Sequence, residues 1–326
     1  MARVLVTGGA GFIGSAIVEE LVAQEHEVRV LDNFATGKRD NLDRVRGSIR
    51  LMEGDIRDPV TVRLAMSDID FVLHQAALSS VARSVVDPVT TAEVNIQGTL
   101  NLLMAARDAR VRRVVFAGSS SVYGDNPQLP KREDAQPMPR SPYAITKLAG
   151  EHYCRVFHQL YGLETVVLRY FNVFGPRQRP DSQYAAVIPK FIDAALHGQR
   201  PVIYGDGKQS RDFTYVSNVV QANLLACEAA EAPGEVLNIA CGSRISLRAL
   251  LDLLSEHTGN GVAPEYAAAR PGDVRHTLAD ISKAERILGY RPHVDMGEGL
   301  RRTVEWHRGR LSFAGISHAS APGASA

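Results

Sequence analysis

The sequence has little cysteine and no long apolar run. Cys154, Cys227 and Cys241 are odd in number and far apart, so neither a disulfide framework nor a metal site is indicated. No run approaches 18 uninterrupted apolar residues, and the apolar N-terminal run is broken by glycines too early for a signal peptide. We therefore expect a cytoplasmic protein with no bound metal and no membrane contact.

Excess charge of either sign is also absent. Lys and Arg number 37 and Asp and Glu 36, which leaves a formal net charge of +1, so no attraction to nucleic acid is built in and any anionic ligand must be held locally. The 45% hydrophobic content fits a globular enzyme. A length of 326 residues favours two domains, or one large domain with an appended lobe.

The first half of the chain alternates short strand patterns with longer helix patterns. The strands, for example 3–7, 27–32 and 71–74, are nearly continuous in Val, Leu, Ile and Phe, as parallel strands covered on both faces are. Ser141-Pro142 and Gly162 are start and stop signals of one long helix. The pattern predicts an α/β fold with a doubly wound parallel sheet, a Rossmann fold.

The residue composition changes after Gly175, where polar, proline-interrupted segments predict a smaller mixed α/β lobe. A helix pattern after Arg211 and a strand pattern before Gly242 suggest that the chain returns to the first domain. The predicted division is 1–172 plus 212–240 for the Rossmann domain, 173–211 plus 241–311 for the lobe, and 312–326 for a mobile tail.

A dinucleotide site is indicated at the first strand-to-helix turn. Gly8, Gly11 and Gly14 stand between a strand and a helix, where bare backbone N–H groups accept a pyrophosphate. Asp32 ends the next strand, where a carboxylate accepts the adenosine ribose hydroxyls and favours NAD over NADP. Lys38 and Arg39 follow, however, and are able to neutralise a 2′-phosphate.

Two further segments lie at the same expected sheet edge. Asp55-Ile56 either caps the adenine edge or is a simple turn after a strand; the residues alone leave both open. Gln75-Ala76-Ala77 follows another strand and gives a cofactor backbone room to pass closely.

Tyr143 and Lys147 form Y-x-x-x-K on the predicted long helix, so both lie on one helix face. A neighbouring cation favours the phenolate that a tyrosine base needs. By itself the spacing is common on solvated helices. Ser119, Ser120 and Ser121, at the carboxyl end of a strand, add hydroxyls where ligands of such sheets bind.

In order along the chain, TGGAGFIGS, HQAA, NIQGT, SSSVYG, SPYAITK, LRYFNVFGPRQ and SRDFTYV resemble the extended short-chain dehydrogenase/reductase family, in its nucleotide-sugar epimerase branch. The resemblance covers about residues 1–308. It implies that Tyr143 is the catalytic base, that Lys147 holds the nicotinamide ribose, and that Ser119 hydrogen-bonds the sugar O4, with Ser120 and Ser121 close enough to share that role.

The resemblance also implies two sets of ligand contacts. Besides the glycines and Asp32, the residues implied to line NAD are Phe12, Ile13, Asn33, Asp55, Ile56, Gln75, Ala76, Ala77, Asn95, Ser119, Tyr143, Lys147 and Phe171. Those implied to hold a UDP-sugar are Ser120, Ser121, Asn172, Ala186, Val187, Tyr204, Arg211, Arg270, Asp273 and Thr277. Arginines on loops also suit a diphosphate physically.

The same resemblance narrows the reaction. Dehydratases of the family carry an acidic pair after the catalytic hydroxyl, decarboxylases a glutamate among these serines, and uronate epimerases a threonine at Asn172. We therefore expect NAD-dependent 4-epimerisation through a transient 4-keto sugar. The alternatives are a UDP-glucuronate 4-epimerase, a nucleotide-sugar 4-ketoreductase with net redox, and a regulatory protein that binds NAD without turnover.

Thr277 stands where relatives that reject N-acetyl sugars have tyrosine, so we expect both UDP-GlcNAc/UDP-GalNAc and UDP-glucose/UDP-galactose to be substrates. The helices after NIQGT and SPYAITK resemble those of a family dimer interface, so a homodimer is expected. Leu100, Leu103, Leu148 and Phe157 fit such an interface, although the same side chains are able to face the sheet.

Overall fold

A seven-stranded sheet organises the molecule in this computed structural model, which describes residues 1–178, 186–259, 261, 263–268 and 274–319. Its strands are parallel and run in the order β11-β6-β5-β4-β1-β2-β3. The bounds are β1 (Arg3–Thr7), β2 (Glu27–Asp32), β3 (Ile49–Glu53), β4 (Phe71–His74), β5 (Arg113–Ser119), β6 (Glu164–Tyr170) and β11 (Val236–Ile239). The predicted doubly wound Rossmann fold is confirmed.

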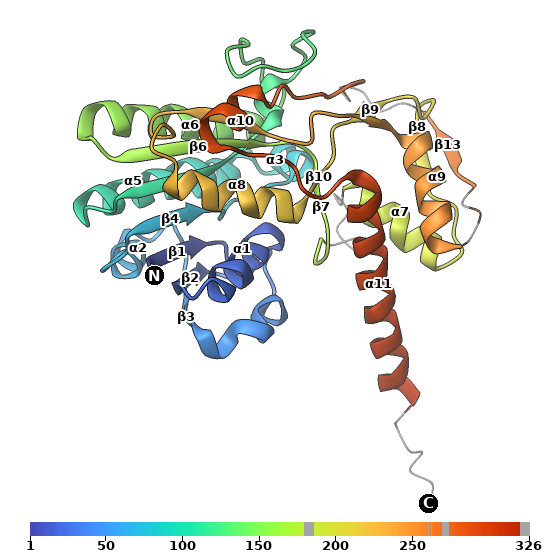
Figure 1. Ribbon diagram of the computed structural model, residues 1–326, viewed down its shortest axis with the longest axis horizontal. Helices are drawn as coiled ribbons and strands as arrows, with labels where there is room; N and C mark the ends of the chain where they lie inside the picture. The colour runs from blue at the N-terminus through green and yellow to red at the C-terminus, as the bar shows by residue number, and fades with distance from the viewer. Residues whose placement is uncertain (179–185, 260, 262, 269–273, 320–326) are drawn as a thin grey trace, which may run out of the picture.

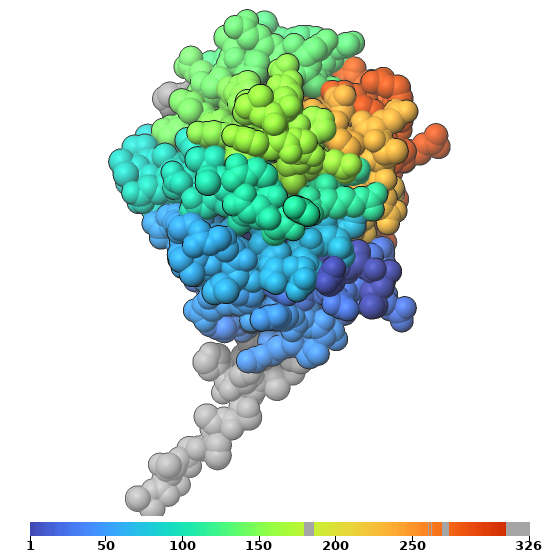
Figure 2. Space-filling view, turned by 90° about the vertical axis from the view of Figure 1, so that its left-hand side faces the viewer, coloured from blue at the N-terminus to red at the C-terminus, as the bar shows by residue number. Residues whose placement is uncertain are grey.

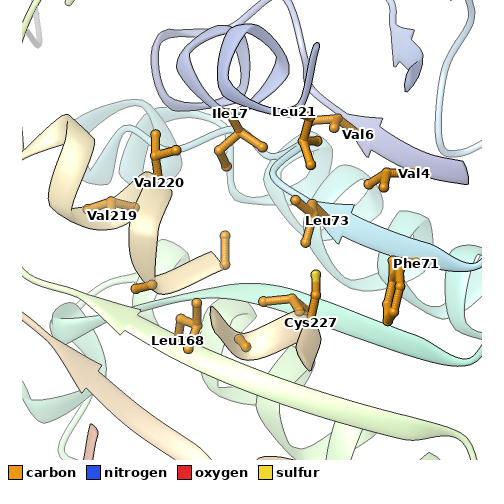
Figure 3. Packing of buried hydrophobic residues seen from close by; sticks show 14 of the residues in the cluster. Val4, Val6, Ile17, Leu21, Phe71, Leu73, Leu168, Val219, Val220 and Cys227 are labelled. Carbon is orange, nitrogen blue, oxygen red and sulfur yellow. The ribbon is translucent and has the colours of Figure 1, made fainter. Parts of the chain in front are cut away.

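Alternate residues of each central strand enter different cores, which explains why these strands are mostly apolar. In β1, Val4 and Val6 belong to one buried cluster and Leu5 to another. In β4, Phe71 and Leu73 join the first cluster, in which they lie near helix residues (Figure 3). Side chains of a strand point to opposite faces in turn, so both faces of this sheet are buried.

Helices cover each face (Figure 1). One face is packed by α1 (Phe12–Ala23), α8 (Val216–Glu228) and α10 (Ser282–Leu288), and the other by α2 (Pro59–Ala65), α5 (Gly98–Asp108) and α6 (Pro142–Tyr161). Figure 2 shows one side of the molecule, on which the blue, N-terminal segments lie below the green segments that follow them in the chain. Helix α6 begins at Ser141, whose hydroxyl accepts the Ala144 N–H, and ends at Gly162 with φ 68°, as predicted.

A smaller lobe has its own buried cluster, which includes Phe174, Phe191 and Leu250. Its helices are α7 (Val187–Leu196), α9 (Leu247–Thr258) and α11 (Met296–Ala319). Its short strand pairs are β7 (Val173–Phe174) with β10 (Thr214–Tyr215), β8 (Val202–Tyr204) with β13 (Glu265–Ala267), and β9 (Ser210–Arg211) with β12 (Ile245–Ser246).

After the lobe segment that contains α7, the chain contributes one more strand to the large sheet, because β11 pairs with β6. Helix α11 continues to Ala319, so the backbone is helical over 312–319, the first part of the segment predicted to be a mobile tail. We retain the division into a Rossmann domain and a two-segment lobe as a proposal. No described helix is long and apolar enough to cross a membrane.

Candidate active site

The glycine turn after β1 leaves no room for side chains. Gly8 has φ 69°, and a Cβ atom there would lie 2.7 Å from the Ala76 nitrogen. A Cβ atom on Gly14 would lie 2.1 Å from the Gly8 carbonyl oxygen. Bare backbone is therefore required at the N-terminus of α1, where N–H groups point outward toward any bound anion.

A cavity of about 300 Å³, here called the glycine cavity, opens at this turn. It brings together most of the residues that the sequence and its family resemblance assigned to a cofactor. They are Gly8, Gly11, Phe12, Ile13, Gly14, Asp32, Asn33, Asp55, Ile56, Gln75, Ala76, Ala77, Tyr143 and Lys147.

Two carboxylates are fixed in its wall. Buried Asp32 accepts the Ala10 N–H at 2.9 Å and the Phe34 N–H at 2.8 Å, and burial raises its pKa. Asp55 accepts hydrogen bonds from Arg57, which lower its pKa to about 2, and another from Asn33 at 2.9 Å. Asp55 is thus ionised in the cavity wall, and it also begins a turn, because its side chain accepts the Arg57 N–H at 2.8 Å and its carbonyl accepts the Asp58 N–H at 3.0 Å.

Of the two basic residues able to neutralise a 2′-phosphate, Arg39 is already engaged. Its guanidinium pairs with Glu53 and lies 4.0 Å from the centre of the Phe34 ring. A 2′-phosphate would have to compete with Glu53 for that cation, and it would also meet the carboxylate of Asp32 in the cavity wall. The arrangement favours NAD over NADP.

A second cavity of about 530 Å³, the serine cavity, adjoins the first. Predicted residues in its lining are Phe12, Ile13, Ser119, Ser120, Ser121, Tyr143, Phe171, Asn172, Arg211 and Thr277. Tyr143 and Tyr170 line both cavities. Phe171 and Ser119 line the serine cavity and are not in the described lining of the glycine cavity, although the resemblance implied a cofactor contact for both and, for Ser119, a hydrogen bond to the sugar as well.

Tyr143 and Lys147 lie buried on the first turns of α6. The Ser84 hydroxyl accepts the Tyr143 N–H at 3.1 Å and so fixes the start of the helix. Burial raises the pKa of the Tyr143 phenol, against which a hydrogen bond with the Ser119 side chain acts. Burial lowers the pKa of Lys147 to about 8, and its ammonium donates to the Ala117 carbonyl at 2.9 Å. A phenolate at Tyr143 therefore needs further positive charge close by.

The smaller lobe contributes a third cavity of about 570 Å³, the lobe cavity, which shares Asn172, Gln178 and Arg211 with the serine cavity. Ala186, Val187 and Tyr204 line it as expected. The sequence reasoning missed Lys190, Arg200 and Gln178 here, since an isolated polar residue carries no spacing signal. Arg270, Asp273 and Arg179 lie outside the described residues.

Arg177 does not line these three cavities as the structure describes them. Its guanidinium pairs with Glu19 and donates to the Ser15 hydroxyl on α1. It joins the lobe to the Rossmann domain rather than adding to the anion-binding cations.

Asn95 lies behind the wall of the glycine cavity rather than in it. Its side chain accepts the Leu78 N–H at 2.8 Å and donates to the Leu78 carbonyl and the Thr146 hydroxyl. These bonds use its polar atoms to hold two segments of the wall. The assignment of Asn95 as a direct cofactor contact is therefore not supported by its position.

A buried chain of hydrogen bonds joins this wall to the sheet through His74. The Ala76 N–H donates to Thr7 Oγ1, and the Thr99 hydroxyl donates to the Asn95 carbonyl. Thr7 must then donate to His74 Nδ1 at 2.7 Å, while His74 Nε2–H donates to Thr99 Oγ1 at 3.0 Å. The histidine is thereby held neutral in one tautomer.

This burial predicts an acid-sensitive fold. Burial lowers the pKa of folded His74 to about 3, whereas an unfolded histidine titrates near 6.5. Below pH 6.5 the unfolded chain takes up the proton first, so stability falls as the pH drops. Between pH 6.5 and 5 the His74 contribution is about 2 kcal/mol. Urea unfolding at pH 7 and pH 5 should show a smaller loss for His74→Gln than for the native protein; equal losses would refute this.

Three comparisons with known proteins find similarity over most of the chain. The model of the NAD dependent epimerase/dehydratase family matches residues 4–240. The UDP-glucose 4-epimerase of Mycolicibacterium smegmatis is 40% identical over 312 residues, which are 94% of this chain and 99% of that protein.

Two solved structures are similar over nearly their whole length. The UDP-N-acetylglucosamine 4-epimerase from Methanobrevibacter ruminantium, in complex with UDP-N-acetylmuramic acid, is 42% identical with a TM-score of 0.91 and covers 95% of this chain and 99% of its own. The UDP-glucose 4-epimerase of Thermus thermophilus, in complex with NAD, is also 42% identical, with a TM-score of 0.86 and coverage of 94% and 99%.

Proposed function

Because the chain belongs to the NAD dependent epimerase/dehydratase family, we propose that it is a UDP-hexose 4-epimerase. It interconverts UDP-GlcNAc with UDP-GalNAc and UDP-glucose with UDP-galactose, through a transient 4-keto sugar. The observation that carries the proposal is the position of Tyr143 in the wall shared by the glycine and serine cavities. One phenol there reaches both a cofactor and a sugar.

The glycine cavity suits NAD. The cradle at Gly8 and Gly14 admits no Cβ atom, so a pyrophosphate can approach the N-terminus of α1. Asp32 would accept the adenosine ribose hydroxyls, and Lys147 would donate to the nicotinamide ribose. When bound, NAD supplies the hydride acceptor and donor, and its positive nicotinamide ring adds the charge that Tyr143 needs.

Tyr143 moves the proton. Its phenolate oxygen takes the proton from the sugar O4 while C4 loses hydride, and the same phenol returns that proton when hydride comes back on the opposite face of the turned 4-keto sugar. Ser119 orients O4, and Lys147 supports the phenolate as long as its ammonium keeps its proton. Fixed positions of both reactants supply much of the rate enhancement.

The sugar nucleotide would lie across the serine and lobe cavities. Arg211 lines both, and Lys190 and Arg200 line the lobe cavity, so cations surround the space for a diphosphate. Arg270 and Asp273 retain the substrate role that the resemblance implies. The sugar end faces Ser120 and Ser121 rather than the acidic pair of a dehydratase.

Cofactor stoichiometry separates the proposal from a 4-ketoreductase, which has net redox. Purified protein should convert UDP-GalNAc or UDP-galactose with catalytic NAD and no added reductant. A requirement for one NADH per product would contradict epimerisation. Failure of UDP-glucuronate to react in the same assay, followed by NMR, would exclude the uronate alternative.

Thr277 is proposed to admit the acetamido group. Its hydroxyl accepts hydrogen bonds from Asn172 Nδ2 at 3.2 Å and the Asp212 N–H at 3.3 Å, and it lines the serine cavity. Thr277→Tyr fills this space and should lower kcat/KM for UDP-GlcNAc relative to UDP-glucose by about 10- to 100-fold. Thr277→Ala, which removes the hydroxyl without adding bulk, is the control. An unchanged substrate ratio in Thr277→Tyr would refute the gate.

A homodimer is proposed through the outer face of α5 and α6. Leu103 and Phe157 are buried in the core, so they do not form that face. Met104, Ile145, Val156 and Leu160 are exposed instead. Sedimentation should give twice the 35.5 kDa chain mass; a monomer would refute the dimer.

We also propose a cytoplasmic location, consistent with three free cysteines. Recovery of the protein in an exported fraction would refute this location.

A further inference from the structure

The first turn of α1 offers no side-chain cation to a pyrophosphate. Helix α1, from Phe12 to Ala23, contains neither lysine nor arginine. Its N-terminus provides N–H groups and a partial positive charge, while a pyrophosphate carries about two negative charges. A side-chain cation for a dinucleotide in the glycine cavity can therefore come only from an element other than α1.

Three cationic side chains line the glycine cavity among the described residues: Arg57, Arg83 and Lys147. Arg57 is engaged in two hydrogen bonds with Asp55, of 2.8 and 3.1 Å, and pairs with Glu93 at 3.4 Å. Lys147 is buried and donates to the Ala117 carbonyl. Of these three cations, Arg83 is the one whose side chain is left to bind a ligand.

Arg83 lies on the short helix α3 (Val81–Val86), whose backbone is held in place. Its N–H donates to the Ser80 hydroxyl at 3.1 Å, and its carbonyl accepts the Asp87 N–H at 2.8 Å. The next residue, Ser84, is buried, binds the Tyr143 N–H and donates to the Val81 carbonyl at 2.6 Å. Helix α3 is thus docked against the start of α6.

The backbone of Arg83 is anchored, but its side chain makes no polar interaction in the described part of the chain. It is half-buried in the cavity wall, whereas Val85 and Val86 of the same helix are exposed, at 65% and 76%. Its guanidinium has no hydrogen-bond or ion-pair partner in the described part of the chain. Arginine donors match phosphate oxygens geometrically, and Arg83 lines neither the serine nor the lobe cavity as described.

We propose that Arg83 binds the pyrophosphate of the dinucleotide in the glycine cavity. The inference rests on the proposed function only in taking that dinucleotide to be NAD. It adds a charged contact from α3 to the backbone contacts at Gly8, Gly11 and Gly14. Since α3 also holds Tyr143 through Ser84, the cofactor and the catalytic helix would share one support.

Binding of three ligands to cofactor-free protein tests the proposal by calorimetry. Arg83→Gln should bind NAD and ADP-ribose about 10- to 100-fold more weakly than the native protein, but should bind adenosine, which lacks phosphate, with less than about twofold change. The affinity of the variant for ADP-ribose should also depend less on salt, and Arg83→Lys should recover part of the loss. Arg63→Gln, an exposed change on α2, is the matched control.

Equal ADP-ribose affinity for Arg83→Gln and native protein would overturn the inference and leave the proposed function intact. A loss confined to NADP would assign Arg83 to a 2′-phosphate and overturn it as well. A third outcome separates the two claims in the other direction. If the native protein binds NAD but epimerises no UDP-hexose, and Arg83→Gln binds NAD more weakly, the inference is supported and the proposed function is overturned.

Discussion

Tyr143→Phe is expected to lower kcat for UDP-hexose epimerisation by about 10²- to 10⁴-fold, the usual contribution of a positioned general acid-base group. The phenol is buried between two cavities, and the substitution removes only its hydroxyl, which interacts with Ser119. The ring that packs against the cavity walls remains. We therefore expect an unchanged fold and unchanged NAD content beside the loss of turnover.

Tyr153→Phe is the matched control for this change. Tyr153 lies on the same helix, partly buried against a hydrophobic cluster, and lines none of the three cavities as the structure describes them. Its variant should turn over at the native rate. Full activity in Tyr143→Phe would show that another group moves the O4 proton.

Glu151→Ala is expected to lower the free energy of unfolding by about 3–5 kcal/mol, the usual effect of leaving a buried charge alone. Glu151 and Arg169 are 4% and 5% exposed, and Arg169 Nη2 lies 2.8 Å from Glu151 Oε2. Arg169 Nε also donates to Glu151 Oε1 at 3.1 Å. Without the carboxylate, the partners of the guanidinium in the described part of the chain are the Glu133 carbonyl and the Tyr123 side chain.

Two variants separate the charge from the contacts. Glu151→Gln keeps an acceptor beside Arg169 and should lose less stability than Glu151→Ala. Since Glu151 raises the pKa of Lys147 one helical turn away, Glu151→Gln should also move the alkaline limb of the kcat profile to lower pH. Glu298→Ala, at the partly exposed start of α11, removes only solvent-facing ion pairs with Arg301 and Arg302 and should lower the free energy of unfolding much less than Glu151→Ala. Equal losses of unfolding free energy in Glu151→Ala and Glu298→Ala, measured by urea unfolding, would contradict this account.

The elements that could be predicted are those whose cause is local. The central strands of the large sheet, such as β1 and β4, are mostly apolar because both of their faces are covered, so a short run of sequence shows them. Helix α6 is marked at its ends by Ser141, Pro142 and Gly162. The glycine turn is visible because Gly8 and Gly14 meet backbone that no side chain could approach.

What the sequence could not predict depends on partners far away in the chain. Asn95 carries the right side chain for a ligand contact, but Leu78 and Thr146 occupy its polar atoms. Arg83 looks like any surface arginine until α3 is placed over the glycine cavity. The segment from residue 312 onward consists of small and polar residues without helical periodicity, so the helical backbone of α11 up to Ala319 could not be predicted from it.

The most direct test of the central claim follows a label at the reacting carbon. UDP-GlcNAc deuterated at C4 is incubated with the purified protein and no added reductant, and the products are followed by NMR. The account predicts UDP-GalNAc that retains the deuterium at C4, because the hydride leaves and returns within one turnover. Loss of the label to solvent, or absence of any product inverted at C4, would contradict it.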